Sequence, residues 1–195
     1  MTYYPEGTNN ALLAAFDDIE DAKEVMRQGR VVEGRVRLCD REHNLHIDLG
    51  GMKGIIPRNE GALGIKQGTV RDIALISKVG KRVCCRVVGF HRDSTGEMIA
   101  VLSRRLVQEE CMRQYIDGLR PGDVIPALVT HLEKFGAFID IGAGINSLIP
   151  IDMLSVSRIS HPAQRLCNGD VIHVVLSKRE AVSYTHLTLP TTWPV

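Results

Sequence analysis

The pattern of hydrophobic and polar positions predicts two consecutive units of short β-strands. β-Branched runs occur at 31–36 and 124–129, and apolar and polar residues alternate at 45–49 and 138–141. Glycines separate these runs, which is typical of strands joined by tight turns. Several short strands with glycine turns favour a small barrel in each unit.

The two units are copies of one pattern. Three segments recur in the same order at a nearly constant spacing: QGRVVEGRV with PGDVIPALV, NLHIDLGG with GAFIDIGA, and VGKRVCCRVV with NGDVIHVVLS. Such self-similarity indicates a repeat. We therefore divide the chain into a helical segment at 1–27, a first barrel at 28–105, a linker helix at 106–119 and a second barrel at 120–180.

Apolar residues also recur at helical spacing in two segments outside the barrels. The first segment runs from Asn10, which can cap a helix, to Gly29, which can end it, and the second ends at Gly118. The two apolar stripes consist of Leu12, Phe16, Ile19 and Met26, and of Leu106, Met112, Tyr115 and Ile116. The outer face of the first helix is acidic.

The segment LEKFGAFIDIGAGINSLIPID, 132–152, carries the clearest candidate for a binding site. A glycine between two strand-forming segments leaves Phe135 and Phe138 three residues apart, so both rings could face outward together. A base that stacks on an exposed aromatic ring contributes about 1–3 kcal/mol, and nearby Lys and Arg can hold the backbone of a single strand. Periodicity alone favours a core position for at least one of the two rings.

The stretch VIPALVTHLEKFGAFIDIGAGINSLIPIDML resembles the S1 RNA-binding domain, a five-stranded OB-fold barrel whose hallmark is an aromatic-Gly-Ala-Phe-Val-Asp-Leu run. Because the resemblance extends over both units, it implies a mainly β protein with two tandem five-stranded OB-fold barrels joined by a helix. It also implies that Phe135 and Phe138 occupy the family's stacking positions on strands two and three. The histidine that the family often carries after the glycine turn is replaced here by Ile149 and Pro150.

The resemblance also directs attention to the charged residues and histidines of each unit. In the first unit the stacking positions are held by His43 and His46, which are smaller than Phe, so this face is expected to bind more weakly. It could instead bind through its cations, and a docking or structural role for this barrel is an equally good interpretation. The first-unit cations are Arg37, Arg41, Lys53, Arg58 and Arg86. The second-unit candidates are His131, Lys134, Arg158 and Lys178.

Composition narrows the remaining classes of function. The net charge is +1, but acids collect in 1–26 and bases in 66–105, where they supply either phosphate contacts or a solvated face. Five cysteines without a C-x-x-C pair indicate reduced thiols. No nucleotide-binding or hydrolase motif is present, so we expect no enzyme activity, cofactor, metal or small-molecule substrate. With no leader and no long apolar run, we expect a cytoplasmic protein without a membrane partner.

The last fifteen residues, 181–195, differ from the rest of the chain. They contain its one Trp and no Lys, Arg or acid, and AVSYTHLTLPTT is similar to the translation of a common sequencing-library adapter. We predict a non-native tail here, and a second barrel that lacks its true last strand. The alternative is a divergent strand, because Val182, Tyr184 and His186 alternate with other residues.

Together these observations predict a protein that binds single-stranded RNA, specifically mRNA, in association with the ribosome and translation. Two alternatives remain open. The barrels could form a protein-docking module that uses the acidic helix as a contact, or the chain could be the N-terminal part of a larger RNA-processing enzyme.

Overall fold

A computed structural model describes residues 3–179 and 187–188 of this chain. It separates into two units, Asn9–Glu110 and Met1–Thr8 with Cys111–Val195, and each is described by itself. The division falls within helix α3 (Arg105–Gln114), which is followed by a short 3-10 turn at Ile116–Gly118. The expectation of a mainly β protein, with two β units and a helix between them in sequence, is confirmed.

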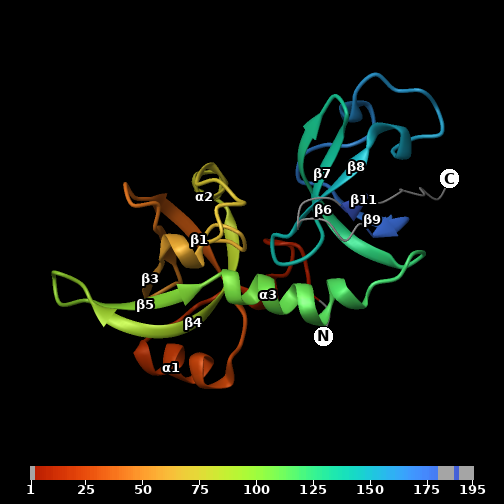
Figure 1. Ribbon diagram of the computed structural model, residues 1–195. Helices are drawn as coiled ribbons and strands as arrows, with labels where there is room; N and C mark the ends of the chain where they lie inside the picture. Colours follow the sequence, from red (N-terminus) through yellow and green to blue (C-terminus); the bar gives the residue numbers. More distant parts are fainter. Residues whose placement is uncertain (1–2, 180–186, 189–195) are drawn as a thin grey trace. The chain divides into compact units, whose positions relative to one another are not determined.

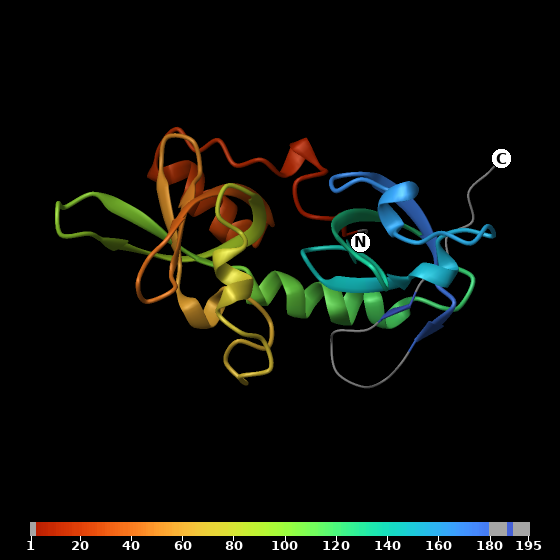
Figure 2. The same cartoon turned by 90° about the horizontal axis from the view of Figure 1, so that it is seen from above.

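The first unit is a closed five-stranded barrel in the order β1-β2-β3-β5-β4. All neighbouring strands are antiparallel except β3 and β5, whose parallel pairing closes the barrel. Strands β4 and β5 continue beyond it as a hairpin (Figures 1 and 2). The five strands are β1 (Val32–Cys39), β2 (Leu45–Asp48), β3 (Lys53–Ile56), β4 (Arg82–Arg92) and β5 (Met98–Ser103).

Alternation of side chains fills this barrel. Leu45 and Ile47 of β2 are buried while His46 between them is not, because successive strand residues point to opposite faces. A short helix, α2 (Ile73–Ile76), contributes only Leu75 to the core. Leu75 and Leu102 of β5 are both fully buried, so the barrel interior is aliphatic.

Helix α1 (Ile19–Gln28) packs beside β4 and begins later than the sequence predicts. The Asp18 carboxylate caps it by accepting hydrogen bonds from the amides of Glu20 and Asp21, and Gly29 ends it at φ 61°. Upstream of this cap, Leu13 and Phe16 form isolated β-bridges to the barrel. The predicted helix start at Asn10 is therefore wrong: Asn10 begins a single 3-10 turn, and barrel pairing keeps the following residues extended.

The second unit contains a sheet in the order β10-β11-β8-β7-β6-β9. Strand β11 runs parallel to β8, the type of pairing that β3 and β5 make in the first barrel. The expected loss of the last strand stays a prediction, because 180–186 and 189–195, most of the predicted tail, lie outside the described residues. The strands are β6 (Val124–Glu133), β7 (Gly136–Asp140), β8 (Asn146–Pro150), β9 (Val171–Val175), β10 (Lys178–Arg179) and β11 (Leu187–Thr188).

No helix within the described ranges combines the length and the apolar character needed to cross a membrane. The five cysteines carry free thiols. Cys84, Cys85 and Cys111 are buried, and burial raises the pKa of the Cys111 thiol to about 12. This thiol therefore stays protonated at neutral pH and acts as a small apolar side chain.

Two strand glycines of the first barrel provide a matched test of how closely its strands pack. A Cβ on Gly34 would lie 2.3 Å from Ile47 Cγ2 and 2.9 Å from the Asp48 carbonyl oxygen, whereas a Cβ on Gly89 would meet nothing within 4 Å. We expect Gly34→Ala to lower the free energy of unfolding by about 1–3 kcal/mol through overpacking. Gly89→Ala should change it by less than about 1 kcal/mol. Urea unfolding followed by circular dichroism measures both, and equal losses would contradict this packing.

Candidate nucleic-acid interface

The candidate interface of the second unit is built on the hairpin of β6 and β7. In β7, Ala137 and Ile139 are fully buried, so Phe138 between them faces outward. A register shift in β6 between Val129 and His131 places His131 opposite Phe138, and the Thr130 hydroxyl donates a 3.1 Å hydrogen bond to the Phe138 carbonyl oxygen. The irregularity keeps Val129 in the core while His131 joins Phe138 outside.

Three rings gather at this end of the hairpin, and we call Phe135, Phe138 and His131 the ring cluster. The Phe135 and Phe138 ring centroids lie 6.0 Å apart with the rings edge to face at 86°. The His131 and Phe138 centroids lie 6.3 Å apart with the rings inclined by only 29°. Phe135 is 56% exposed and Phe138 half-buried, so the cluster offers aromatic surface to the solvent. Neither Phe lies in the core.

Backbone contacts hold the cluster in place. A Cβ on Gly136 would lie 2.3 Å from the Ile149 carbonyl oxygen, so only glycine allows β7 and β8 to approach this closely. The Ile151 amide donates a 2.9 Å hydrogen bond to the Phe135 carbonyl oxygen. At the other end of β7, the buried Asp140 carboxylate accepts hydrogen bonds from Gly142 and Gly144 in the turn. The Phe135 backbone is therefore fixed although its ring is exposed.

The charges near the ring cluster have both signs. His131 Nε2 lies 2.8 Å from a carboxylate oxygen of Glu133, a residue that the sequence reasoning missed. Glu133 could have been found from the strand period of two, which puts it on the same side of β6 as His131. Lys134 and Arg158 are exposed and form no ion pair within the described part of the chain, and Lys178 lies on β10. The structure thus brings His131, Phe135 and Phe138 together, with Lys134 adjacent in sequence.

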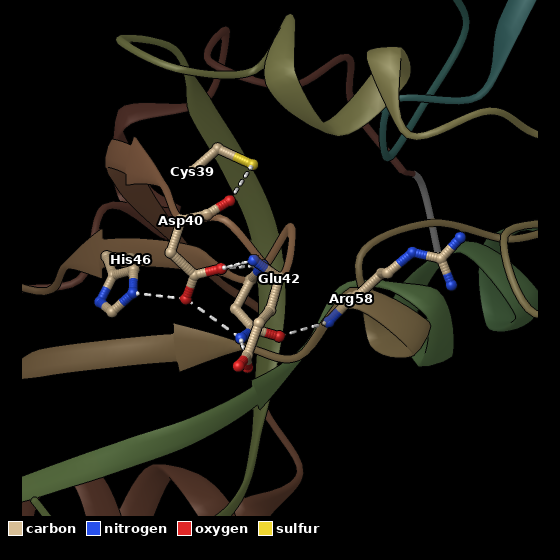
Figure 3. Close-up of polar contacts among 6 residues, drawn as sticks. Cys39, Asp40, Glu42, His46 and Arg58 are labelled. Carbon is tan, nitrogen blue, oxygen red and sulfur yellow. Dashed lines mark hydrogen bonds and ion pairs between the residues drawn. The ribbon is translucent and has the colours of Figure 1, made fainter.

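In the first barrel, β1 and β2 pair in the same way as β6 and β7 but carry different outward side chains. A register shift between Val36 and Leu38 places Leu38 opposite His46, as His131 lies opposite Phe138 in the second barrel. His43 sits in the β1–β2 turn at φ 63°. No described ring lies against His46, and its Nε2 instead contacts an Asp40 carboxylate oxygen at 3.1 Å (Figure 3).

Asp40 is the centre of a small polar network at this turn. Its carboxylate accepts hydrogen bonds from the backbone amides of Glu42 and Asn44 and from the Asn44 side-chain amide, all within 3.0 Å. The Asn44 side-chain oxygen in turn accepts from the Arg58 amide at 3.0 Å. Burial alone would raise the pKa of the Asp40 carboxyl, but the hydrogen bonds from Asn44, His46 and Glu42 outweigh it and lower this pKa. The network therefore requires an ionised Asp40.

The cations predicted to serve this first face are mostly paired with acids. Arg58 forms a two-point contact with Asp72 at 2.7 and 3.2 Å, and Lys53 Nζ lies 2.6 Å from Glu97. Arg37 pairs with Asp48 and Arg86 with Glu110. Arg41 alone among the five makes no ion pair within the described residues. Each pairing offsets positive charge that would otherwise attract phosphate.

No group of three or more His, Cys, Asp or Glu side chains within the described residues is arranged to hold a metal ion.

Comparisons with known proteins agree with this geometry. Residues 119–181 match the model of the S1 RNA binding domain family. Small ribosomal subunit protein bS1 of Leuconostoc lactis is 31% identical over 147 residues, 75% of this chain and 32% of that protein. The bS1 homolog of Bacillus subtilis is 29% identical over 147 residues, 75% of this chain and 36% of that protein. This chain thus spans about a third of the length of these curated relatives.

Among solved structures, the chain is similar to a multidomain protein with nucleic acid binding domains from Streptococcus pneumoniae, to which it is 16% identical. The match covers 96% of this chain and 57% of the Streptococcus pneumoniae chain. The TM-score of this match is 0.33.

The Asp40 network predicts a particular pH dependence of stability. Because the folded-state pKa of Asp40 is lowered, its stabilising effect is complete above about pH 5 and is lost as the pH falls below the ordinary value of 3.8. Asp40→Asn should therefore lower the free energy of unfolding by about 1–2 kcal/mol at neutral pH. The difference from wild type should shrink progressively as the pH falls below 3.8. Urea unfolding at a series of pH values measures this, and a pH-independent difference would contradict the role of the ionised carboxylate.

Proposed function

The chain is an S1 RNA-binding domain protein, distantly similar to small ribosomal subunit protein bS1, and from this premise we propose that its second barrel binds single-stranded RNA through the ring cluster. The observation that carries the proposal is the exposure of Phe135 beside Phe138 and His131 at the end of the β6–β7 hairpin. Exposed rings of this kind stack unpaired bases, and duplexes cannot offer their bases in this way. Lys134, Arg158 and Lys178 are the proposed phosphate contacts.

Under this proposal the two barrels contribute unequally. The first face has imidazoles in place of phenyl rings, and four of its five candidate cations are already paired. It therefore adds a weak second contact rather than a second site of equal strength. Because both barrels belong to one chain, even a weak second contact raises the overall affinity through effective concentration.

We propose mRNA as the RNA and translation as its setting, since the relatives are named as proteins of the small ribosomal subunit. The proposed role is binding without catalysis, because ring stacking and phosphate contacts change no covalent bond. A cytoplasmic location belongs to the same proposal.

Replacing the two phenyl rings separates stacking from simple apolar contact. Phe135→Leu with Phe138→Leu keeps most of the apolar volume but removes both aromatic ring faces. This double variant should bind an unstructured 12-nucleotide RNA at least tenfold more weakly than wild type, because each stacked base contributes about 1–3 kcal/mol. Phe135→Tyr with Phe138→Tyr keeps the rings and should bind within about threefold of wild type. Fluorescence anisotropy measures both.

Two further measurements complete this test. His43→Ala with His46→Ala, at the equivalent positions of the first barrel, should weaken binding several-fold less than the leucine variant. Lys134→Gln should reduce the slope of log K against log salt concentration by about 0.7, the value for one phosphate contact with a single strand. Unchanged affinity in the leucine variant would overturn the stacking proposal, and a flat salt dependence would overturn the phosphate contacts.

A second candidate function, docking on the ribosome through a protein contact, is favoured by a surface at α2. Ile73 and Ile76 of α2 and Val79 of the turn that follows it are 65%, 44% and 43% exposed. Lys66, Arg71 and Lys81 are exposed nearby in the sequence and form no ion pair within the described residues. We call these six residues the α2 surface. Aliphatic side chains do not stack bases, so this surface fits an acidic protein partner better than RNA.

Charge reversal tests this candidate. Ile73→Glu with Ile76→Glu should abolish co-sedimentation with purified bacterial small ribosomal subunits, because it removes the apolar contact and repels an acidic partner. Val156→Glu, at a fully exposed position of the second unit, is the matched control and should leave co-sedimentation unchanged. If the α2 variant sediments like wild type while the leucine variant of the ring cluster does not, contact with the ribosome depends on RNA alone and docking is excluded.

A further inference from the structure

Glu133 places a carboxylate beside the proposed RNA-binding surface. A carboxylate repels phosphate, so its presence there calls for a physical explanation. Glu133 lies at the end of β6, opposite Gly136 and one hydrogen bond from the ring cluster. Its side chain is 46% exposed and that of His131 is 59% exposed, so both edges remain open to a ligand. The single contact to His131 occupies one of the four lone-pair positions of the carboxylate.

The open lone pairs of Glu133 point to a particular kind of base edge. A carboxylate accepts hydrogen bonds and donates none, so it pairs best with two adjacent donors. Guanine offers two neighbouring donors, N1–H and the exocyclic N2 amino group, on its Watson–Crick edge. Adenine and cytosine each place a ring acceptor beside their amino group, and uracil places acceptors on both sides of its one N–H. Only guanine can make a two-point contact with a carboxylate.

The geometry of the cluster brings such an edge within reach. His131 and Phe138 are inclined by only 29°, and Glu133 contacts the edge of the His131 ring at 2.8 Å. A base stacked on these rings lies roughly parallel to them, and its Watson–Crick edge can face the side of the cluster on which Glu133 contacts His131. Building on the proposed RNA binding, we propose that Glu133 selects guanine at the ring cluster.

A positioning role for Glu133 gives a different result. If the carboxylate only orients the imidazole of His131, its loss weakens the binding of every base alike. If it selects guanine, its loss removes the preference for guanine and does not weaken the binding of RNAs that carry the other bases. Glu133→Gln separates the two roles, since the amide oxygen can still accept a hydrogen bond from His131 but the amide cannot accept two donors from guanine.

The experiment uses three RNAs: a 12-nucleotide oligouridine, the same RNA with one central guanosine, and the same RNA with one central inosine. Inosine keeps N1–H but lacks the N2 amino group. Wild type should bind the guanosine RNA about tenfold more tightly than the other two, as expected for one two-point contact to a base. Glu133→Gln should bind guanosine and inosine RNAs equally, and it should bind oligouridine at least as tightly as wild type does, because one charge that repels phosphate is removed.

Glu20→Gln on α1 is the matched control for the removal of one negative charge, and it should keep the guanosine preference. Equal binding of guanosine and inosine RNAs by wild type would overturn base selection by Glu133 and leave RNA binding intact. Equal weakening of all three RNAs in Glu133→Gln would assign the residue to positioning and overturn selection. Failure of wild type to bind any of the three RNAs would instead refute the proposed function itself.

Discussion

Alternate burial along β7 is the constraint on which the candidate site depends. Ala137 and Ile139 have no exposed surface, and the strand period of two then leaves Phe138 no position except the outer face. Because Ala137 and Ile139 point into the core, the Phe138 ring points outward. Part of its apolar surface is therefore left in contact with water. Such a cost is typical of a binding surface rather than of a core strand.

The two β units show how one strand arrangement can support different surfaces. Each has a register shift at the same point of its first strand, and each places one outward residue of the second strand opposite it. In the second barrel this position holds Phe138 within a ring cluster. In the first it holds His46, which is bound to the Asp40 network. The backbone therefore sets where a surface residue stands, and side-chain chemistry sets what it can bind.

The sequence predicts the parts of this structure that depend on local pattern. The repeat, the strand alternation and the glycine turns locate the two barrels, and the spacing of Phe135 and Phe138 locates the ring cluster. Contacts between residues far apart in sequence could not be predicted in this way. Lys53 and Glu97 are an example: nothing local in the sequence indicates that they form an ion pair, because their proximity depends on the parallel pairing of β3 with β5. The sequence therefore could not show which of the predicted first-face cations are paired with acids.

The start of α1 illustrates a second limit of local pattern. Leu12, Phe16, Ile19 and Met26 fit a helical stripe, yet the helix begins only at Ile19. The amide of Phe16 donates to the Leu49 carbonyl oxygen at 2.9 Å, and Gly51 donates back to the Phe16 carbonyl oxygen at 2.8 Å. Both backbone groups of Phe16 are thus satisfied by the barrel, which removes the need for helical hydrogen bonds there. Tertiary pairing overrides propensity at this point, and Asp18 supplies the cap where the pairing stops.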